Sequence, residues 1–233
     1  MREIVLDTET TGLDPASGHR IVEVACLELL NHIPTGRNYQ SYVNPERDVP
    51  ADAAAVHGLS AEFLSDKPRF AEIADELLRF IADAPLVIHN AEFDVRFLNA
   101  EFERLARPPL PGERIVDTAL IARQKFPGAP ASLDALCRRF AIDNSARTKH
   151  GALLDSELLA DVYLELIGGR QAGLELTVAE RATAALAVGG RTPRPARPHA
   201  PTEAELAAHA ILVASLKDPI WSGRSSDEHG LRL

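Results

Sequence analysis

The stretch Glu3–Gly12, EIVLDTETTG, decides how this chain is expected to begin folding. Its first five residues are an apolar run that ends in an acid, which predicts a buried strand. Side chains alternate between the faces of a strand, so Asp7 and Glu9 point the same way if the strand continues through Thr8. Two such carboxylates repel each other, and a bound divalent cation relieves the repulsion. For an isolated D-x-E motif, a solvated strand end is the favoured alternative.

A third carboxylate follows a second short apolar strand, Leu86–Ile88. A helical pattern begins near Phe93, so Asp94 falls in the first turn of a helix. An acid at this position also interacts favourably with the helix dipole, and that role alone is an alternative explanation for Asp94. We interpret His89 as a polar residue that closes the strand rather than as a ligand.

The last motif, HGALLD, runs from His150 to Asp155. Residues five apart on a helix diverge by about 140°, so the two side chains cannot share a face in mid-helix. We therefore place Asp155 in the first turn of a helix over Leu153–Ile167 and His150 on the preceding loop, where Gly151 adds freedom. A neutral imidazole beside a metal site can act as a general base. Taken alone, the motif could be a surface histidine followed by a helix-start acid.

The three motifs are separate signals, and their order along the chain gives them a joint meaning that none has alone. With them the chain resembles the DEDDh 3′–5′ exonucleases, and among these the epsilon (proofreading) subunits of bacterial DNA polymerase III. The first motif is VLDTETTG, the second is VIHNAEFD and the third is HGALLD, whose histidine marks the h subtype. The likeness covers roughly residues 1–169 and includes VHGLS, VDTALIARQKFPG and SLDALCRRFAIDNSART.

The resemblance implies a ribonuclease H-like α/β fold with a mixed five-stranded sheet flanked by helices. It also implies two divalent cations, Mg²⁺ or Mn²⁺. Asp7, Glu9 and Asp155 would bind the cation nearer the attacking water, and Asp7 would bridge to the second cation. Asp94 would hold the second cation, and His150 would accept the proton of the water.

The resemblance further implies that nucleoside monophosphates are removed from a DNA 3′ end. Asp52 and His57 stand where the family contacts the terminal nucleotide, together with Asp7, Glu9 and Asp155. Two other functions remain open. The same residues would serve an RNA exonuclease that trims RNA 3′ ends or short oligonucleotides, and the fold could also be a scaffold for a polymerase without activity of its own.

The composition of the chain agrees with an enzyme of the cytoplasm. The 233 residues carry a net charge of -9, whereas a protein that binds DNA by itself is normally basic. A partner is therefore expected to supply part of the DNA affinity. The sequence has no run of ~18 apolar residues and enters a strand at once, so we expect no membrane span and no signal peptide. Cys26 and Cys137 are expected to be reduced core thiols.

Apolar periodicity predicts ten elements in the first 169 residues. The expected strands are Glu3–Asp7, Ile21–Leu30, Asn38–Val43, Leu86–His89 and Arg114–Val116. The expected helices are Phe70–Ala82, Asp94–Leu105, Thr118–Lys125, Ser132–Phe140 and Leu153–Ile167. Three strands followed by alternating helices and strands predict a mixed sheet with helices on its faces.

The character of the sequence changes after Gly169. We expect an exonuclease domain over residues 1–170, a clamp-binding peptide over 171–176, a flexible linker over 177–201 and a polymerase-binding segment over 202–233. The peptide QAGLEL resembles the motif that polymerase-associated proteins insert into the sliding clamp, with Gln171, Leu174 and Leu176 as its contacts. A chance helix-to-linker transition is the alternative. The linker is rich in Gly, Pro and Arg.

A short helix is expected at the far end of the chain. Thr202 and Glu205 form a capping box, apolar residues recur at helical spacing, and Pro219 marks the stop. Such a helix either folds back on its own catalytic domain or docks in a groove on a partner, which we favour. The resemblance implies that the partner is the polymerase catalytic (alpha) subunit, and a small theta-like subunit is a further possible partner.

Overall fold

The computed structural model of this chain describes residues 1–147, 149–169 and 200–217. The chain consists of two compact units, Met1–Leu174 and Glu175–Leu233. The expected clamp-binding peptide, nearly all of the expected linker and residues 218–233 lie outside the described residues. Among the helices of the described ranges, none is long and apolar enough to cross a membrane.

The first unit is built on a mixed five-stranded sheet, as the sequence predicts. The strands are β1 (Arg2–Thr10), β2 (Ile21–Leu30), β3 (Ile33–Tyr42), β4 (Leu86–Ile88) and β5 (Ile115–Asp117). Their order across the sheet is β3-β2-β1-β4-β5. β1 lies at the centre, antiparallel to β2 and parallel to β4, and β4 pairs in parallel with β5.

Two strands are longer than their apolar patterns predict. β1 continues to Thr10 because β2 pairs with it over its whole length, down to the pair Thr10↔Ile21. β3 begins at Ile33 instead of Asn38, and its first six residues are exposed. An edge strand of this kind is held by backbone pairing with β2, so its sequence shows no apolar alternation from which its start could be predicted.

Seven α-helices surround the sheet. They are α1 (Ala51–His57), α2 (Ala61–Leu64), α3 (Phe70–Ile81), α4 (Glu92–Arg104), α5 (Thr118–Lys125), α6 (Leu133–Phe140) and α7 (Ala152–Leu166). Two 3-10 turns, η1 (Pro15–Ser17) and η2 (Gly112–Arg114), complete the unit. The five predicted helices are confirmed within two residues at each end. The short α1 and α2 were not predicted, because they bury few side chains and show little helical periodicity.

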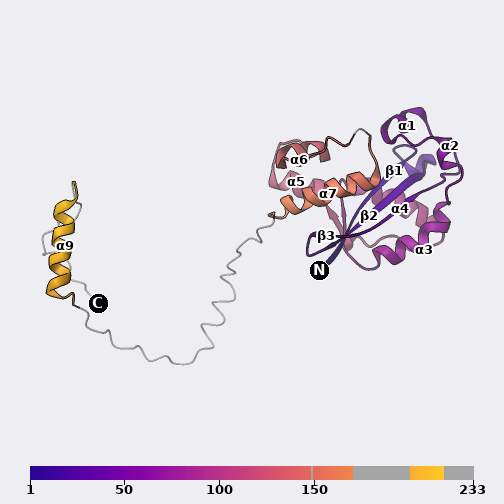
Figure 1. Cartoon of the computed structure of the whole chain (residues 1–233). Coiled ribbons are helices and arrows are strands. Elements are labelled where there is room, and N and C mark those ends of the chain that lie inside the picture. The colour runs from indigo at the N-terminus through magenta and orange to yellow at the C-terminus, as the bar shows by residue number, and fades with distance from the viewer. Residues whose placement is uncertain (148, 170–199, 218–233) are drawn as a thin grey trace, which may run out of the picture. The chain divides into compact units, whose positions relative to one another are not determined.

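The sheet has a separate apolar core on each face. Helices α3 and α4 cover one face of the sheet, and α5, α6 and α7 cover the other (Figure 1). Side chains of each group of helices belong to the core on their own face. Along β1, Ile4 belongs to the first core and Val5 to the second. Alternation therefore turns Asp7 and Glu9 toward the α7 side and Thr8 toward the α4 side. The two predicted core thiols, Cys26 and Cys137, are free and buried, one in each core.

The second unit contains α9 (Glu203–Ser215). The predicted capping box is present, because Thr202 Oγ1 accepts from Glu205 N while the Glu205 carboxylate accepts from Thr202 N. The helix ends at Ser215, earlier than expected, and Leu216 is already extended. Large apolar side chains are exposed on it, namely Leu206 (54%), Ile211 (73%) and Leu212 (58%).

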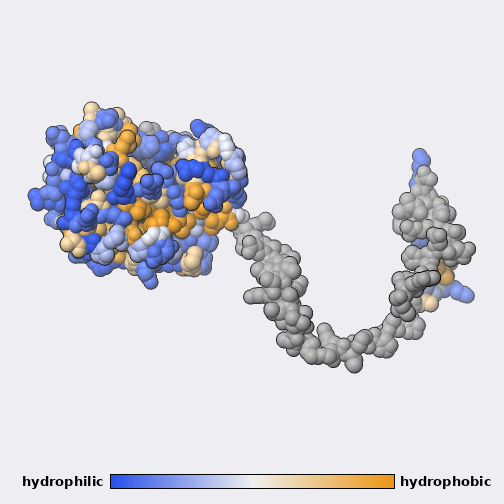
Figure 2. All heavy atoms as spheres, turned by 180° about the vertical axis from the view of Figure 1, so that it is seen from behind, coloured by the Kyte–Doolittle hydropathy of each residue, from blue (hydrophilic) through white to orange (hydrophobic). Residues whose placement is uncertain are grey.

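On the face of the first unit seen in Figure 2, hydrophobic residues form patches between hydrophilic ones. Its exposed large apolar side chains include Leu13, Leu30, Ile33, Val56, Phe63, Leu120 and Ile167.

Candidate active site

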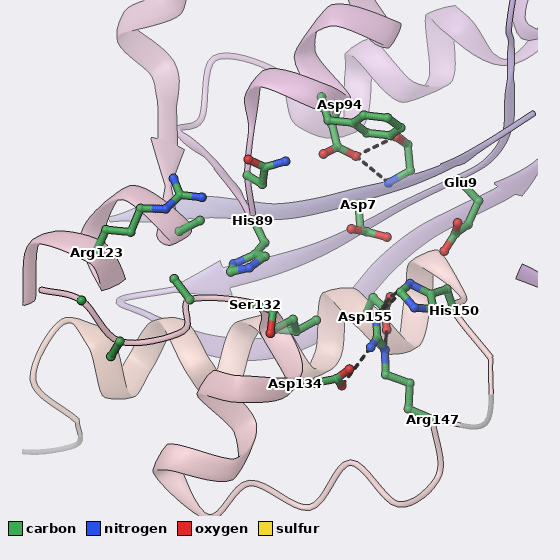
Figure 3. Close-up of a pocket in the computed structure, with 18 residues that line it drawn as sticks. Asp7, Glu9, His89, Asp94, Arg123, Ser132, Asp134, Arg147, His150 and Asp155 are labelled. Carbon is green, nitrogen blue, oxygen red and sulfur yellow. Dashed lines mark hydrogen bonds and ion pairs between the residues drawn. The ribbon is translucent and has the colours of Figure 1, made fainter. Parts of the chain in front are cut away.

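All five residues that the sequence singled out for metal or proton chemistry line one pocket of about 950 Å³ (Figure 3). These are Asp7, Glu9, Asp94, His150 and Asp155. They come from β1, from the start of α4 and from the start of α7. The fold therefore brings together side chains that lie far apart in the sequence.

Asp7 and Glu9 reach the pocket from the central strand. Because β1 runs through Thr8 without a break, both carboxylates lie on the same face, as predicted. Glu9 stands opposite Glu23 in the register with β2, and Glu23 is itself buried. Glu23 was not singled out from the sequence. Its carboxylate accepts from Gln40 Nε2 at 2.7 Å and from the backbone N–H of Ala152 at 3.2 Å.

Asp94 lies in the first turn of α4 and is fixed by β1. The backbone N–H of Thr8 donates to Asp94 Oδ1 at 3.0 Å, and Thr8 Oγ1 donates to the same oxygen at 2.6 Å. Both bonds are buried, and Asp94 is 3% exposed. Its second oxygen has no part in these bonds, so it can face the pocket.

The loop that leads to α4 is held by Asp117, the last residue of β5. Asp117 accepts from the backbone N–H groups of Asn90 at 3.2 Å and Ala91 at 3.3 Å. The same carboxylate caps α5 by accepting from the N–H groups of Ala119 and Leu120. Asp117 thus connects the loop before α4, the helix that contains Asp94, to the beginning of α5.

The third motif has the geometry that its spacing predicts. α7 begins at Ala152, so Asp155 lies in its first turn and is 3% exposed. His150 lies on the preceding loop, and its side chain is 49% exposed. The backbone N–H of His150 donates to Val56 O at 3.1 Å, which anchors this loop to α1. Glu23 holds the start of α7 from the opposite side through Ala152.

The donor set fits a divalent cation. Glu9, His150 and Asp155 each offer one ligand atom, and these atoms lie within 4.8 Å of one another. Carboxylate oxygens such as those of Glu9 and Asp155 are the ligands that Mg²⁺ and Mn²⁺ prefer, whereas an imidazole suits softer metals such as Zn²⁺. Asp7 and Asp94 line the same pocket and add two further carboxylates.

Burial and neighbouring negative charges raise the pKa values of three carboxylates in the pocket. Burial, together with the charges of Asp94, Glu9 and Asp155, raises the pKa of Asp7 well above its usual range. Burial and the charges of Asp155, Glu23 and Asp94 raise the pKa of Glu9 to about 8. Burial raises the pKa of Asp94 to about 7, against the lowering effect of the Thr8 hydrogen bonds. A cation in this pocket would relieve all three shifts.

One basic residue of the pocket, Arg147, was missed in the sequence. It lies on the loop between α6 and α7, and its side chain is only 8% exposed. Its guanidinium contacts Asp155, Asp134 and His150. A lone arginine three residues before His150 gives no sequence signal, because loop arginines are usually solvated. Asp134 was also missed, because an acid in the first turn of a helix is usually explained by the helix dipole.

The two residues expected to contact the nucleotide lie on α1, outside the set that lines the pocket. His57 is buried at the end of α1, and its Nδ1 accepts from the N–H of Leu59. Burial lowers its pKa, and the charges of Lys149 and His150 lower it further. His57 therefore lies near the His150 loop. Asp52 is exposed at the start of the helix.

His89, expected to close the second strand, also lines the pocket. It follows β4, and its Nδ1 lies 2.9 Å from Thr118 Oγ1. Burial lowers its pKa, so the neutral ring is favoured.

Four carboxylates and a histidine, brought by a central strand and two helix starts into one pocket, form an acidic cluster of the kind that could hold divalent cations in a metal-dependent nuclease. Comparison with known proteins is consistent with that class. The family model described as Exonuclease (RNase_T) matches residues 4–163. Among solved structures, exonuclease X in complex with 5′ overhanging duplex DNA is 25% identical with a TM-score of 0.54, covering 70% of this chain and 90% of its own. The nuclease domain of 3′hExo, a DEDDh family member bound to rAMP, is 17% identical with a TM-score of 0.62; it covers 71% of this chain and 91% of its own, and supports the fold alone.

Curated relatives narrow the class further. DNA polymerase III subunit epsilon of Rickettsia felis is 50% identical over 222 residues, which span 93% of this chain and 97% of the relative. DNA polymerase III subunit epsilon of Escherichia coli K12 is 49% identical over 177 residues, or 72% of each chain. The chain belongs to the exonuclease family and, within it, to the epsilon subunits of DNA polymerase III.

Proposed function

We propose that this chain is a metal-dependent 3′–5′ DNA exonuclease that proofreads for a bacterial replicative DNA polymerase. One observation carries the proposal: the carboxylates of Asp7, Glu9, Asp94 and Asp155 converge with His150 in a single pocket. The near full-length similarity to epsilon subunits supports the assignment to replication. The chain removes mispaired nucleotides from a DNA 3′ end as nucleoside monophosphates.

Asp7, Glu9 and Asp155 would hold one of two divalent cations, Mg²⁺ or Mn²⁺, and Asp94 would hold the other together with Asp7. When bound, the two cations acidify the attacking water and neutralise the charge that develops on the leaving 3′-oxygen. Thr8 keeps Asp94 aimed at the pocket by occupying its other oxygen.

His150 is the general base of the reaction. It lies on a loop beside Asp155 and is half exposed, so its ring can reach a water at the cleaved bond. A neutral imidazole accepts the proton of that water and releases it to solvent afterwards. The short tether of the loop to Val56 keeps this ring near α1, where the substrate end is expected.

The terminal nucleotide contacts Asp52 and His57 as well as the metal-binding carboxylates. His57 is the stronger candidate for this contact, because it is buried near the His150 loop, whereas Asp52 is exposed to solvent. An RNA exonuclease would use the same groups. The relatives named as DNA polymerase subunits favour DNA as the substrate.

The parts beyond residue 170 serve attachment. We keep the division into an exonuclease domain (1–170), a clamp-binding peptide (171–176), a linker (177–201) and a polymerase-binding segment (202–233). α9 carries Leu206 and Val213 seven residues apart, and therefore on one helical face, and this face docks into an apolar groove on the polymerase alpha subunit. Gln171, Leu174 and Leu176 engage the sliding clamp, and a theta-like subunit is a further partner. The site of action is the cytoplasm.

A nuclease assay on purified full-length chain tests the proposal. Three 5′-labelled substrates of one sequence are compared: single-stranded DNA, single-stranded RNA, and a duplex with a mispaired 3′ end. Each is incubated with Mg²⁺, with Mn²⁺ and with EDTA, and Asp7→Ala serves as the control. We expect stepwise shortening of both DNA substrates only with metal. Equal rates on RNA would favour the trimming function, and no cleavage by the intact chain would refute the enzyme.

A further inference from the structure

The most unusual contact of the pocket is a buried fork between Arg147 and Asp155 (Figure 3). Arg147 Nε donates to Asp155 Oδ1, and Arg147 Nη2 donates to Asp155 Oδ2 at 2.6 Å. Both side chains are nearly buried, at 8% and 4% exposure. A bidentate pair of this kind is the strongest geometry available to a guanidinium and a carboxylate.

The fork occupies a ligand of the proposed cation site. Asp155 offers its carboxylate to a cation together with Glu9 and His150, whose ligand atoms lie within 4.8 Å. The guanidinium already supplies positive charge to that carboxylate. A divalent cation brought to the same oxygens meets both the repulsion of Arg147 and the loss of two charge-assisted hydrogen bonds.

The same guanidinium also engages His150. Arg147 Nη2 lies 3.0 Å from His150 Nδ1, and a guanidinium is a donor only, so Nδ1 must accept. In a neutral imidazole that accepts at Nδ1, the proton sits on Nε2. The ring then has no free lone pair with which to take a proton from water. In this arrangement His150 is close to the site and yet cannot act as a base.

Arg147 has a second partner to move to. Its Nη1 donates to Asp134 Oδ1 at 2.9 Å, and Asp134 is held in place by Asn144 Nδ2 at 3.0 Å. The Asp134 side chain is 45% exposed, so its carboxylate has room for a closer pairing. The guanidinium can therefore leave Asp155 without becoming an unpaired buried charge.

We propose that Arg147 is an internal cation that exchanges with the catalytic metal. In the metal-free chain it pairs with Asp155 and occupies the lone pair of His150. When the cation binds, Arg147 withdraws onto Asp134, which releases Asp155 as a ligand and His150 as a base in one step. The inference rests on the proposed metal site and adds a positioning residue that couples metal loading to activation of the base.

Metal affinity is the first test. Mn²⁺ binding to the full-length chain is measured by calorimetry for the native protein, Arg147→Met, Asp134→Asn and the control Arg123→Met. Arg123 lines the same pocket without belonging to the fork. Arg147→Met should bind Mn²⁺ on the order of tenfold more tightly, since one opposing charge is gone. Asp134→Asn should bind more weakly, because the displaced guanidinium loses its partner, and Arg123→Met should match the native chain within about twofold.

The ring of His150 supplies a second, spectroscopic test. ¹⁵N chemical shifts of its two ring nitrogens are recorded in EDTA and with saturating Mg²⁺. We expect a proton on Nε2 in EDTA and a change at Nδ1 when Mg²⁺ binds, with Arg147→Met lacking the EDTA signature. A purely structural arginine would leave these shifts independent of metal.

Two outcomes separate the inference from the function on which it rests. If the native chain and every variant bind no Mn²⁺, the proposed metal site is refuted, and the exchange with it. If the native chain binds Mn²⁺ and Arg147→Met binds it equally or less tightly, the metal site stands and the exchange is refuted.

Discussion

Asp7 and Glu9 illustrate what single residues contribute to this site. Their place follows from strand alternation, and their unusual electrostatics follow from being crowded together away from water. Such crowding destabilises a protein that has no cation to place there. The pair is therefore best understood as a feature kept for binding, at the expense of stability.

Substitutions of Asp7 and His150 should have different effects on turnover. Asp7→Ala removes the proposed bridging ligand and should abolish activity, whereas His150→Ala should lower kcat by roughly 10²–10⁴. Single-turnover rates on a 3′-mispaired duplex with Mg²⁺ measure both. Asp7→Asn serves as the folding control, because it should unfold in EDTA no more easily than the native chain. Native activity in either alanine variant would show that the substituted residue has no part in the mechanism.

The raised pKa of Glu9 predicts how stability depends on pH. The pKa rises from 4.5 in the unfolded chain to about 8 in the fold, so the folded state binds more protons between these values. The free energy of unfolding should therefore fall as pH rises through this window, and Glu9→Gln should flatten the fall. Metal must displace the same proton, so Mn²⁺ affinity should rise with pH. Denaturant titrations in EDTA from pH 5 to pH 8 measure the slopes, and equal slopes in both proteins would contradict this reading.

The sequence identified the acidic residues and the histidine but not Arg147 or Glu23. Acids beside a strand end or a helix start form local patterns, and their family motif reinforces them. Arg147 acts through partners brought by α6 and α7, and Glu23 accepts a hydrogen bond from Ala152 at the start of α7. Neither role leaves a local pattern, so only the assembled fold reveals it.

At the scale of elements, the site depends on how β1, α4, α5 and α7 begin and end. Asp94 and Asp155 lie in the first turns of helices and His150 lies just before one, whereas Asp7 and Glu9 lie within β1. The starts of the helices are held by side chains that connect several elements. Asp117, for example, connects β5, α5 and the loop before α4. Loss of such a bridge should damage activity more than loss of an ordinary cap.

Asp117→Ala tests this point. It removes four accepted N–H bonds and should lower the free energy of unfolding by about 1–3 kcal/mol. It should also lower kcat, because the loop before Asp94 is released. Ser60→Ala is the matched control, since Ser60 caps α2 away from the pocket. Ser60→Ala should lower the free energy of unfolding by about 0.5–2 kcal/mol and leave kcat unchanged. A normal kcat in Asp117→Ala would show that Asp94 is positioned by Thr8 alone.

The elements themselves were largely predictable. Buried elements such as Ile21–Leu30 and Thr118–Lys125 were predicted with their observed bounds, because burial imposes a pattern on the sequence. β3 was placed too late and α1 was missed. β3 is an edge strand held by backbone pairing, and α1 is a short exposed helix held by neighbouring loops, so neither needs an apolar face.

At the scale of the whole molecule, the proposed function assigns catalysis to the first unit and attachment to the second. The first unit has its own sheet, two cores and the complete pocket. α9 has exposed apolar side chains and buries none of its own residues. Such a helix gains stability only by docking, which agrees with a subunit that depends on a partner for DNA affinity.

Charged substitutions in α9 should separate the two roles. Leu206→Asp combined with Val213→Asp should weaken binding to the polymerase alpha subunit by tenfold or more, about 1.4 kcal/mol or above, while leaving the hydrolysis of single-stranded DNA unchanged. Ala204→Asp is the control, because it adds the same charge about 160° around the helix from Leu206. Surface plasmon resonance and the nuclease assay measure the two properties. Undiminished binding of the double variant would show that the docking site lies elsewhere in the chain.

The most direct test of the account is an anomalous diffraction experiment on crystals of the full-length chain soaked in Mn²⁺. We predict two manganese peaks in the pocket, one among Asp7, Glu9 and Asp155 and the other between Asp7 and Asp94. Asp7→Asn crystals should lose at least one of them. A map with no manganese among these carboxylates, at a concentration that supports DNA hydrolysis, would contradict the central claim that they act as a metal centre.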